Sequence, residues 1–202
     1  MNQALTHLIR KVFPNFRRIS VSETGVWLNA KRDAHMCDKL LAAQIVSLCH
    51  EKKWNKVIDL GCGPGDYVKY LRSHNISSTG VDGNPNTASF CSGCQVADLT
   101  QPFPFAEDYD CVLSLEVGEH IPEKYEKTFL DTLCQSKKGI ILSWYPNKDE
   151  EGDGHVNQRS NEYVSKQIEG RGFKRLVKEG DALRKSCKVW WFKESLMVFE
   201  RS

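Results

Sequence analysis

The sequence predicts an α/β fold in which helices cover both faces of a mostly parallel sheet. Three observations support this prediction: short apolar runs alternate with helical patterns, several of these runs end in an acidic residue, and one run leads directly into a glycine-rich loop. Apolar strands that alternate with helices are typical of parallel sheets buried on both faces. A chain of 202 residues is long enough for one such fold, so we expect a single domain over 1–202.

The expected elements follow in chain order. Asp33 is a candidate N-cap for a helix over 34–50, which belongs to an N-terminal helical cap over 1–50. Only 178–195 separates the last two expected strands, so a loop or short helix with an antiparallel return of the last strand is favoured. In the core over 54–202, strands are expected at 56–60, 78–81, 95–97, 110–115, 139–144, 173–177 and 196–200, and helices at 67–73, 122–134 and 161–171.

Composition and charge limit the function. The net charge is +2 and no apolar run reaches membrane-spanning length, so we expect no membrane association and a cytoplasmic location. Basic residues outnumber acidic ones in 1–56 and 166–202, whereas acidic residues dominate 57–165. An acidic centre suits a cationic ligand, and the basic flanks are available to an anionic partner or to solvent.

The chain contains 8 cysteines at irregular spacing. Several lie within apolar patterns, as free buried cysteines do in a reduced compartment. Cys91 and Cys94 form a lone C-x-x-C pair, and the sequence offers no second pair to complete a zinc site. A packing role is therefore favoured for this pair, and a redox or metal role is the alternative.

A glycine motif follows the first expected strand. Residues 57–66 read V-I-D-L-G-C-G-P-G-D, an apolar run that ends in an acid and continues into alternating glycines. A buried strand followed by a tight loop, where the backbone approaches a ligand, gives this pattern. The spacing differs from the G-x-G-x-x-G of dinucleotide-binding proteins and lacks the Lys-Ser/Thr ending of a P-loop. It resembles the first motif of class I S-adenosylmethionine (SAM)-dependent methyltransferases.

This resemblance covers about residues 54–200. It implies a seven-stranded, Rossmann-like sheet with a reversed last strand, and it implies an enzyme that uses SAM as its cofactor. Acids end three successive expected strands at Asp59, Asp82 and Asp98. Asp82 is expected to accept hydrogen bonds from the ribose hydroxyls and Asp98 from the adenine amino group, while Asp59 would order the glycine loop. The other cofactor-binding residues implied by the resemblance are Gly61, Cys62, Gly63, Gly65, Gly83, Asn84, Leu99 and Leu115.

A second group of polar residues follows the fourth expected strand. Glu116, Glu119 and His120 lie within five residues at a strand end and can converge on one point. Carboxylate oxygens and imidazole nitrogens suit Mg²⁺, Mn²⁺, Fe²⁺ or Zn²⁺ better than Ca²⁺. The E-x-x-E-H pattern resembles two groups of methyltransferases: those that modify the 2′-oxygen at the 3′ end of small RNAs, and the O-methyltransferases of ubiquinone biosynthesis.

In the RNA-modifying group a second histidine completes a divalent-metal site, and His155 stands at the corresponding place in this sequence. The resemblance therefore implies Glu116, Glu119, His120 and His155 as metal ligands, with His120, Glu116 and His155 as the catalytic residues. A metal-free general base at His120 or His155 is the alternative, and a structural role is a third interpretation.

Three functions fit these motifs. The first is metal-assisted O-methylation of a small polar or phenolic metabolite, which suits a compact chain with no separate RNA-binding module. The second is 2′-O-methylation at RNA 3′ ends, which suits the E-x-x-E-H pattern and the basic flanks. The third is a non-catalytic, SAM-binding partner protein. The motifs do not specify the acceptor or the oligomeric state.

Substrate selection is expected in the additions to the sheet, at 1–50, 144–158 and 178–193. Trp27, with Phe13, Phe16 and the nearby basic pairs, is a candidate lid or anion contact, and a solvated face is the alternative. Trp190 and Trp191 are candidates for stacking on a ring or a base, and packing at the sheet edge is their alternative role.

Overall fold

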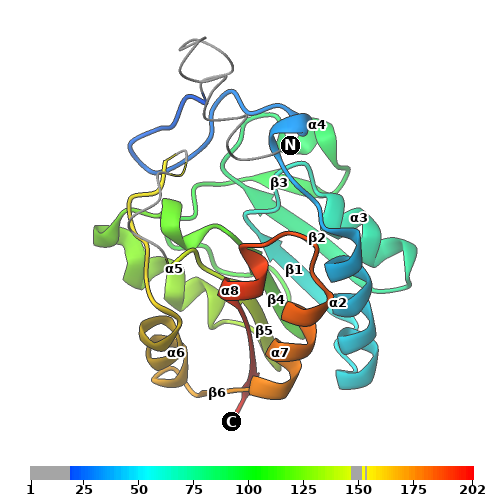
Figure 1. Ribbon diagram of the computed structural model, residues 1–202. Coiled ribbons are helices and arrows are strands. Elements are labelled where there is room, and N and C mark those ends of the chain that lie inside the picture. Colours follow the sequence, from blue (N-terminus) through cyan, green and yellow to red (C-terminus); the bar gives the residue numbers. More distant parts are fainter. Residues whose placement is uncertain (1–18, 147–151, 153) are drawn as a thin grey trace.

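The structure, a computed structural model, describes residues 19–146, 152 and 154–202 (Figure 1). It contains a seven-stranded sheet with the strand order β3-β2-β1-β4-β5-β7-β6. The strands are β1 Lys56–Leu60, β2 Ser77–Asp82, β3 Cys94–Val96, β4 Cys111–Leu115, β5 Gly139–Ser143, β6 Phe173–Arg175 and β7 Leu196–Arg201. The α-helices are α2 Lys39–Lys52, α3 Asp66–Ser73, α4 Thr87–Phe90, α5 Glu126–Leu133, α6 Asn161–Glu169, α7 Val177–Ser186 and α8 Phe192–Ser195.

The sheet is parallel except at one strand. β1 pairs in parallel with β2 and β4, and β5 continues the parallel order beside β4. β7 runs antiparallel to both β5 and β6. The predicted α/β fold with its reversed last strand is therefore confirmed. Two helices, α7 and α8, occupy the connection between β6 and β7 where a loop or short helix is expected.

Apolar side chains alternate between the two faces of the sheet. In β5, Ile140 and Leu142 belong to a cluster that includes residues of α5 and α6, while Ile141 belongs to a cluster that includes residues of α2 and α7. Figure 1 shows α5 and α6 on one side of the sheet and α2, α3 and α7 on the other. Because successive residues of a strand point to opposite faces, both faces of the sheet are buried.

The first long helix begins later than the sequence predicts. α2 starts at Lys39, and its N-cap is Asp38, whose side chain accepts hydrogen bonds from the N–H groups of Leu40 and Leu41. Asp33, the predicted cap, lies instead in a 3-10 turn that precedes α2. The carboxylate that satisfies the first amides of a helix decides where the helix begins, and apolar periodicity alone does not locate it.

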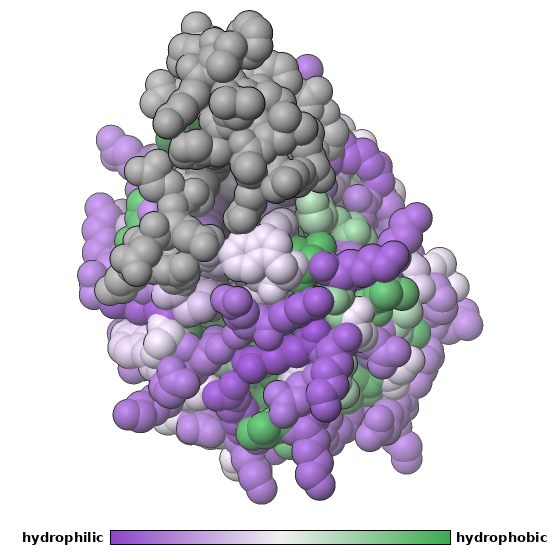
Figure 2. Space-filling model, in the orientation of Figure 1, coloured by the Kyte–Doolittle hydropathy of each residue, from purple (hydrophilic) through white to green (hydrophobic). Residues whose placement is uncertain are grey.

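The face of the molecule shown in Figure 2 is mostly hydrophilic, with apolar residues in small separate groups among the charged ones. Among the described residues, no helix combines the length and the apolar character needed to cross a bilayer.

Gly139, at the start of β5, lies directly against the buried ring of Trp54. A Cβ atom on Gly139 would be 2.1 Å from Trp54 Cζ2, far inside van der Waals contact. We therefore expect Gly139→Ala to lower the free energy of unfolding by about 1–3 kcal/mol, because overpacking forces the ring or the strand to move. Denaturant unfolding measures this change.

Gly170→Ala is the matched control, because Gly170 has ordinary right-handed φ and ψ angles and its Cβ would come no closer than 3.2 Å to another heavy atom. Equal stability of the two variants would contradict the tight contact at Gly139.

Candidate active site

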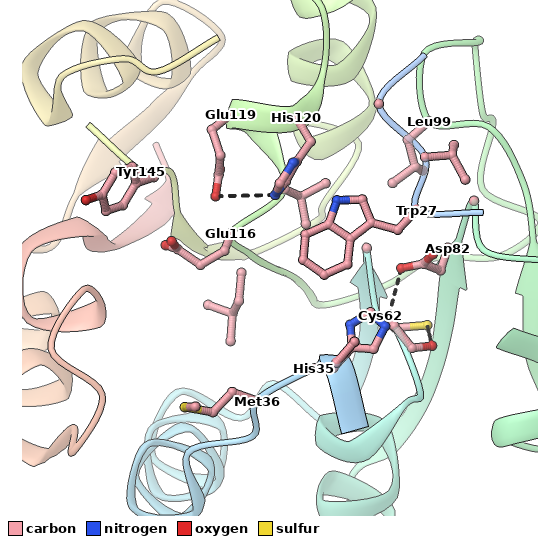
Figure 3. Close-up of a pocket in the computed structure, with 18 of the residues that line it drawn as sticks. Trp27, His35, Met36, Cys62, Asp82, Leu99, Glu116, Glu119, His120 and Tyr145 are labelled. Carbon is pink, nitrogen blue, oxygen red and sulfur yellow. Dashed lines mark hydrogen bonds and ion pairs between the residues drawn. The ribbon is translucent and has the colours of Figure 1, made fainter. Parts of the chain in front are cut away.

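A cavity of about 450 Å³ lies at the carboxyl ends of the central strands. Its wall includes the loop after β1, the ends of β2 and β4, the segment before α2 and the turn between α7 and α8. The strand order reverses direction between β1 and β4, and parallel sheets bind ligands at such a point. Figure 3 shows labelled side chains from several of these segments, among them Met36, Cys62 and Glu116, around one common space.

The loop between β1 and α3 depends on glycine. Gly61, Gly63 and Gly65 have φ values of 83°, 50° and 70°, in the left-handed region that other residues rarely adopt. Gly63 also lies against a ring, since a Cβ atom there would be 2.7 Å from Nδ1 of His35. The loop backbone thereby forms part of the cavity wall, as the glycine motif predicts.

Asp82 connects the end of β2 to this loop. Its Oδ2 atom accepts a hydrogen bond from the N–H of Gly63 at 2.7 Å, and its Oδ1 atom accepts one from the N–H of Asn84 at 2.7 Å. The carboxylate that binds the loop backbone here is that of Asp82, and the ordering role expected of Asp59 stays a prediction. Each carboxylate oxygen has a second lone pair, so Asp82 can also accept hydrogen bonds from a ligand.

Asp59 and Asp98 border the same cavity. Burial raises the pKa of Asp59 well above its usual value, and the charges of Cys94 and Asp82 act in the same direction. A cationic group beside Asp59 would offset this effect. Asp98 turns towards Thr100, whose N–H and hydroxyl both donate to Asp98 Oδ1, at 2.9 Å and 2.7 Å. Its other oxygen remains for a ligand.

Two of the predicted cofactor residues lie away from the cavity. The α-carbon of Gly65 faces the side chain of Cys91, and Asn84 is buried, with its Nδ2 donating to the carbonyl of Ala30 at 2.9 Å. Both positions shape the surrounding turns. The predicted site residues that do line the cavity are Asp59, Gly61, Cys62, Gly63, Asp82, Gly83, Asp98, Leu99, Leu115, Glu116, Glu119, His120 and His155.

Glu119, His120 and His155 converge in this cavity. One donor atom from each lies within 4.8 Å of the others, and Glu119 Oε1 is 4.0 Å from Nε2 of both histidines. The Glu119 side chain is completely buried, and neither of its oxygens makes a hydrogen bond of normal geometry among the described residues, although Glu116 and the backbone of Tyr145 lie near it. A buried carboxylate without a partner is costly, so the arrangement favours a cation or a proton donor among these three side chains.

The hydrogen bonds of His120 define which of its nitrogens faces this group. Nδ1 lies 3.2 Å from the carbonyl oxygen of Gly154, which can only accept, so Nδ1 carries the proton and Nε2 carries the lone pair. Burial, assisted by the charge of His155, lowers the pKa of His120 to about 4. His120 is therefore neutral near pH 7. A neutral imidazole with its lone pair directed towards Glu119 suits a metal ligand or a general base.

Backbone hydrogen bonds bring His155 to this position. The N–H of Asn157 donates to the carbonyl of Glu119 at 2.9 Å, and the indole N–H of Trp144 donates to the carbonyl of Asn157 at 2.7 Å. The amide of Asn157 also donates to Glu126 of α5 at 2.9 Å. The segment that carries His155 is thereby anchored two residues further along the chain, at Asn157.

Glu116 lies at the cavity wall but outside the cluster of Glu119, His120 and His155. Its φ of 55° is in the left-handed region, which costs a residue with a side chain about 1–3 kcal/mol. Its Oε1 atom accepts a hydrogen bond from the hydroxyl of Ser195 at 2.9 Å. The structure therefore gathers three of the four predicted metal ligands, and the fourth, Glu116, lies next to Glu119 while it also binds Ser195 of α8.

A turn over residues 20–28 covers the cluster. Its Gly25 lies on the backbone of His120, because a Cβ atom at Gly25 would be 1.9 Å from the carbonyl oxygen of His120. The ring of Trp27 is 5.3 Å from that of His120 and 5.6 Å from that of His35, and Figure 3 shows it between His120 and Asp82. This position agrees with the lid predicted for Trp27, whereas Phe13 and Phe16 lie outside the described residues.

The sequence does not predict His35 as a site residue, and it does not predict which side chains Trp27 contacts. Trp27 Nε1 and His35 Nε2 are buried and have no hydrogen-bond partner within the described residues. Both side chains line the cavity. Buried polar atoms without protein partners commonly await a ligand or water. The only signal in the sequence was the presence of these rings in the segment before α2.

Aromatic side chains continue the wall from His155 to α8. Tyr145 lies 5.1 Å from the ring of His155 and 6.3 Å from that of Trp190, which in turn lies 5.7 Å from that of Trp191. Both tryptophans line the cavity, so they do more than pack at the sheet edge. Asp38 helps to hold this segment, since its Oδ2 atom accepts from the N–H groups of residues 188 and 189 at 2.6 Å and 2.9 Å.

Comparisons with known proteins agree with this geometry. A family described as a methyltransferase domain matches residues 28–179. The chain is 34% identical over 110 residues to the chloroplastic tocopherol O-methyltransferase of Arabidopsis thaliana, a match that covers 46% of this chain and 31% of that protein. The chain thus spans about a third of the length of this curated relative.

Two solved structures share the fold. The magnesium protoporphyrin IX methyltransferase of Synechocystis PCC 6803 with bound SAM has a TM-score of 0.60 and 18% identity, covering 80% of this chain and 78% of that one. The methyltransferase domain of the bacterial protein CtHen1 has a TM-score of 0.57 and 20% identity, covering 80% of this chain and 96% of that one.

Asp38 makes the stability of the fold depend on pH. Burial raises the pKa of Asp38, but hydrogen bonds from four backbone N–H groups outweigh this effect and hold the pKa below its usual value. The ionised form therefore stabilises the fold above the unfolded-state pKa of about 4, and this stabilisation is lost as the pH falls through the lower folded-state value. We expect Asp38→Asn to lower the free energy of unfolding by about 1–2 kcal/mol at pH 7.

Urea unfolding of both proteins between pH 7 and pH 3 measures the effect, and the difference between them should shrink below about pH 4. The control is Asp108→Asn, at a side chain that is 81% exposed. A difference that stays constant with pH would show that the charge of Asp38 has no role.

Proposed function

Because the chain belongs to the methyltransferase-domain family of class I SAM-dependent methyltransferases, we propose that it transfers a methyl group from SAM to an oxygen of a small polar or phenolic metabolite. One observation carries the proposal: the glycine loop with Asp82 and the cluster of Glu119, His120 and His155 border the same cavity. Direct transfer between two bound molecules requires adjoining sites of this kind.

The cavity residues fit SAM by their chemistry. Asp82 would accept hydrogen bonds from the ribose hydroxyls and Asp98 from the adenine amino group, while the loop N–H groups and Asp59 would face the amino-acid end. The raised pKa of buried Asp59 supports a cationic neighbour, and the nitrogens of Trp27 and His35, which have no partner in the described part of the chain, could supply further polar contacts. When bound, SAM supplies an electrophilic methyl group.

The acceptor hydroxyl would lie beside Glu119, His120 and His155. These residues also fit a divalent metal, since the unpaired Glu119 oxygens and the His120 Nε2 lone pair offer oxygen and nitrogen donors of the kind that Mg²⁺, Mn²⁺, Fe²⁺ or Zn²⁺ accept. Such a metal would lower the pKa of the acceptor hydroxyl. Without a metal, Nε2 of His120 would accept the hydroxyl proton.

The plant relative is named as a tocopherol O-methyltransferase, which supports a phenolic acceptor, and the aromatic wall formed by Trp27, Tyr145 and Trp190 is compatible with a ring. The gathering of Glu119 with two histidines also supports the second candidate, 2′-O-methylation of RNA 3′ ends. A non-catalytic SAM-binding protein is the weakest candidate, because it has no need of this cluster.

Replacement of Asp82 tests the cofactor assignment. Asp82→Ala removes the proposed acceptor for the ribose and also frees the N–H of Gly63. We expect at least about a 100-fold rise in the Kd for SAM, which corresponds to two charged hydrogen bonds at roughly 1.5 kcal/mol each. Isothermal titration calorimetry measures the affinity, and Asp108→Ala is an exposed control. Unchanged affinity would rule out the assignment of Asp82.

The same proteins are then supplied with SAM carrying a labelled methyl group and with two sets of acceptors, phenolic metabolites and short RNAs. Labelled phenolic products would support the first candidate. Labelled RNA whose 3′ end resists periodate oxidation would support the second, because a 2′-O-methyl group removes the vicinal diol that periodate cleaves. SAM binding without labelled product in either set would favour the non-catalytic candidate.

Replacement of His155 tests whether metal affinity can be lost without loss of cofactor affinity. We expect His155→Ala to weaken Mn²⁺ binding by about tenfold or more while the affinity for SAM stays the same, because His155 lies with Glu119 and His120 rather than on the glycine loop. Titration of both ligands by calorimetry measures the two affinities. His50→Ala, on the exposed side of α2, is the control. Activity that resists a chelator, or no Mn²⁺ binding to the unaltered protein, would favour the metal-free base.

A further inference from the structure

Three thiols from separate segments meet behind the glycine loop. Cys62 belongs to this loop, Cys91 follows α4 and Cys94 begins β3. All three are buried, and they form a cluster with Val68 of α3. The sequence presents Cys91 and Cys94 as a lone pair, and the fold adds the third thiol to it.

Two glycines show how closely the sulfurs approach one another. A Cβ atom at Gly80 would lie 2.5 Å from the sulfur of Cys62 and 3.0 Å from that of Cys94. A Cβ atom at Gly65 would lie 2.7 Å from the sulfur of Cys91 and 3.2 Å from that of Cys94. The sulfurs of Cys62 and Cys94 therefore meet at Gly80, and those of Cys91 and Cys94 meet at Gly65, where the absence of a side chain leaves room for them. Cys94 belongs to both pairs.

Cys94 is the most acidic of the three thiols. Hydrogen bonds from Cys62 and, to a lesser extent, from Cys91 lower the pKa of Cys94 to about 6, although burial acts in the opposite direction. The guanidinium of Arg72 adds a positive charge, with Nη1 4.0 Å from the Cys91 sulfur. Because the thiolate is the form that reacts with peroxides, Cys94 is the expected nucleophile.

The arrangement favours pairs of thiols over a three-thiolate metal site. The three cysteines do not bring their sulfurs within 4.8 Å of one another. Among residues 19–146, 152 and 154–202, Glu119, His120 and His155 are the group whose ligand atoms meet this condition. The sulfurs therefore do not surround one ion position. Two adjacent thiols, of which one is acidic, suit a two-electron oxidation.

We propose that Cys62 and Cys94 form a reversible disulfide when a peroxide oxidises the protein. The Cys94 thiolate attacks one peroxide oxygen, so that an S–O bond forms, the O–O bond breaks and the leaving hydroxide takes up a proton to become water. The Cys62 sulfur then attacks the Cys94 sulfur, so that the S–S bond forms, the S–O bond breaks and the second oxygen leaves as water with the Cys62 proton. The two thiols lose two electrons, and one peroxide gains them.

Cys62 lines the cavity and the Cys94 sulfur lies beside it at Gly80, so the oxidant would reach Cys94 by passing the Cys62 side of the cavity wall. The disulfide joins the glycine loop to β3 and draws the Cys62 sulfur away from the carbonyl of Gly63, which lies 3.8 Å from it. Gly63 is the residue whose N–H binds Asp82. Oxidation therefore weakens the cofactor site, and only this last consequence rests on the proposed function.

Peptide mapping tests the disulfide. The full chain is reduced, desalted and treated with hydrogen peroxide, and its remaining thiols are then alkylated before digestion and mass spectrometry. We expect a linked peptide pair that contains Cys62 and Cys94 and separates on reduction. Cys91→Ser should keep this link, whereas Cys62→Ala and Cys94→Ala should lack it. Thermal melts verify that the variants fold. If a variant does not fold, the peptide map of the unaltered protein still decides whether the link forms.

Binding of S-adenosylhomocysteine tests the consequence. Saturation of the reduced protein should slow the crosslink, and the oxidised protein should bind this ligand at least about tenfold more weakly until it is reduced again. A link between Cys91 and Cys94, a sulfinic acid at Cys94 without any link, or one zinc ion retained by the thiols would overturn the proposal. If the reduced protein binds no S-adenosylhomocysteine, the proposed function fails, and the peptide map still decides the disulfide.

Discussion

Burial of both faces of the sheet is the constraint on which the rest of the structure depends. Parallel strands covered by helices on each side leave no place for charged groups along their length, so such groups collect where the strands end. Asp59, Asp82 and Glu116 occupy these ends on three neighbouring strands. Their carboxylates meet at one edge of the sheet because the strands run in the same direction. The candidate site is a consequence of this arrangement rather than an addition to it.

One hydrogen bond stabilises this edge. The carboxylate of Asp82 holds the N–H of Gly63 and so fixes the glycine loop relative to β2. The left-handed backbone of the loop then lets its N–H groups face the cavity. On the opposite side, the carbonyl of Glu119 binds the segment that carries His155. Backbone atoms thus position both halves of the site, and the side chains remain available for ligands.

Local signals account for what the sequence could predict. β1 has the predicted bounds, Lys56–Leu60, because an apolar run between polar residues and a glycine turn defines a strand without help from distant residues. The cluster of Glu119 and His120 could be predicted because both residues stand in one short motif at a strand end. His155 was found through a resemblance between families and not from periodicity.

Distant contacts account for what the sequence could not predict. The start of α2 depends on Asp38, whose carboxylate also binds the backbone of residues 188 and 189. Glu116 turns towards Ser195, which no local pattern places beside it. The positions of Trp27 and Cys62 likewise follow from segments that meet only in the folded chain. Patterns in a sequence report neighbours along the chain, and these residues are defined by neighbours in space.

The position of β7 in the sheet makes one edge strand depend on another. β7 lies between β5 and β6, and β6 pairs with no other strand in the part of the chain that the structure describes. β5 and β7 are far apart in sequence, as the pairing of Ile141 with Val198 shows. Closing so long a loop costs conformational entropy before any contact compensates for it. β6 can therefore stay in the sheet only while β7 is docked on β5, so displacement of β7 would remove two strands from this edge at once.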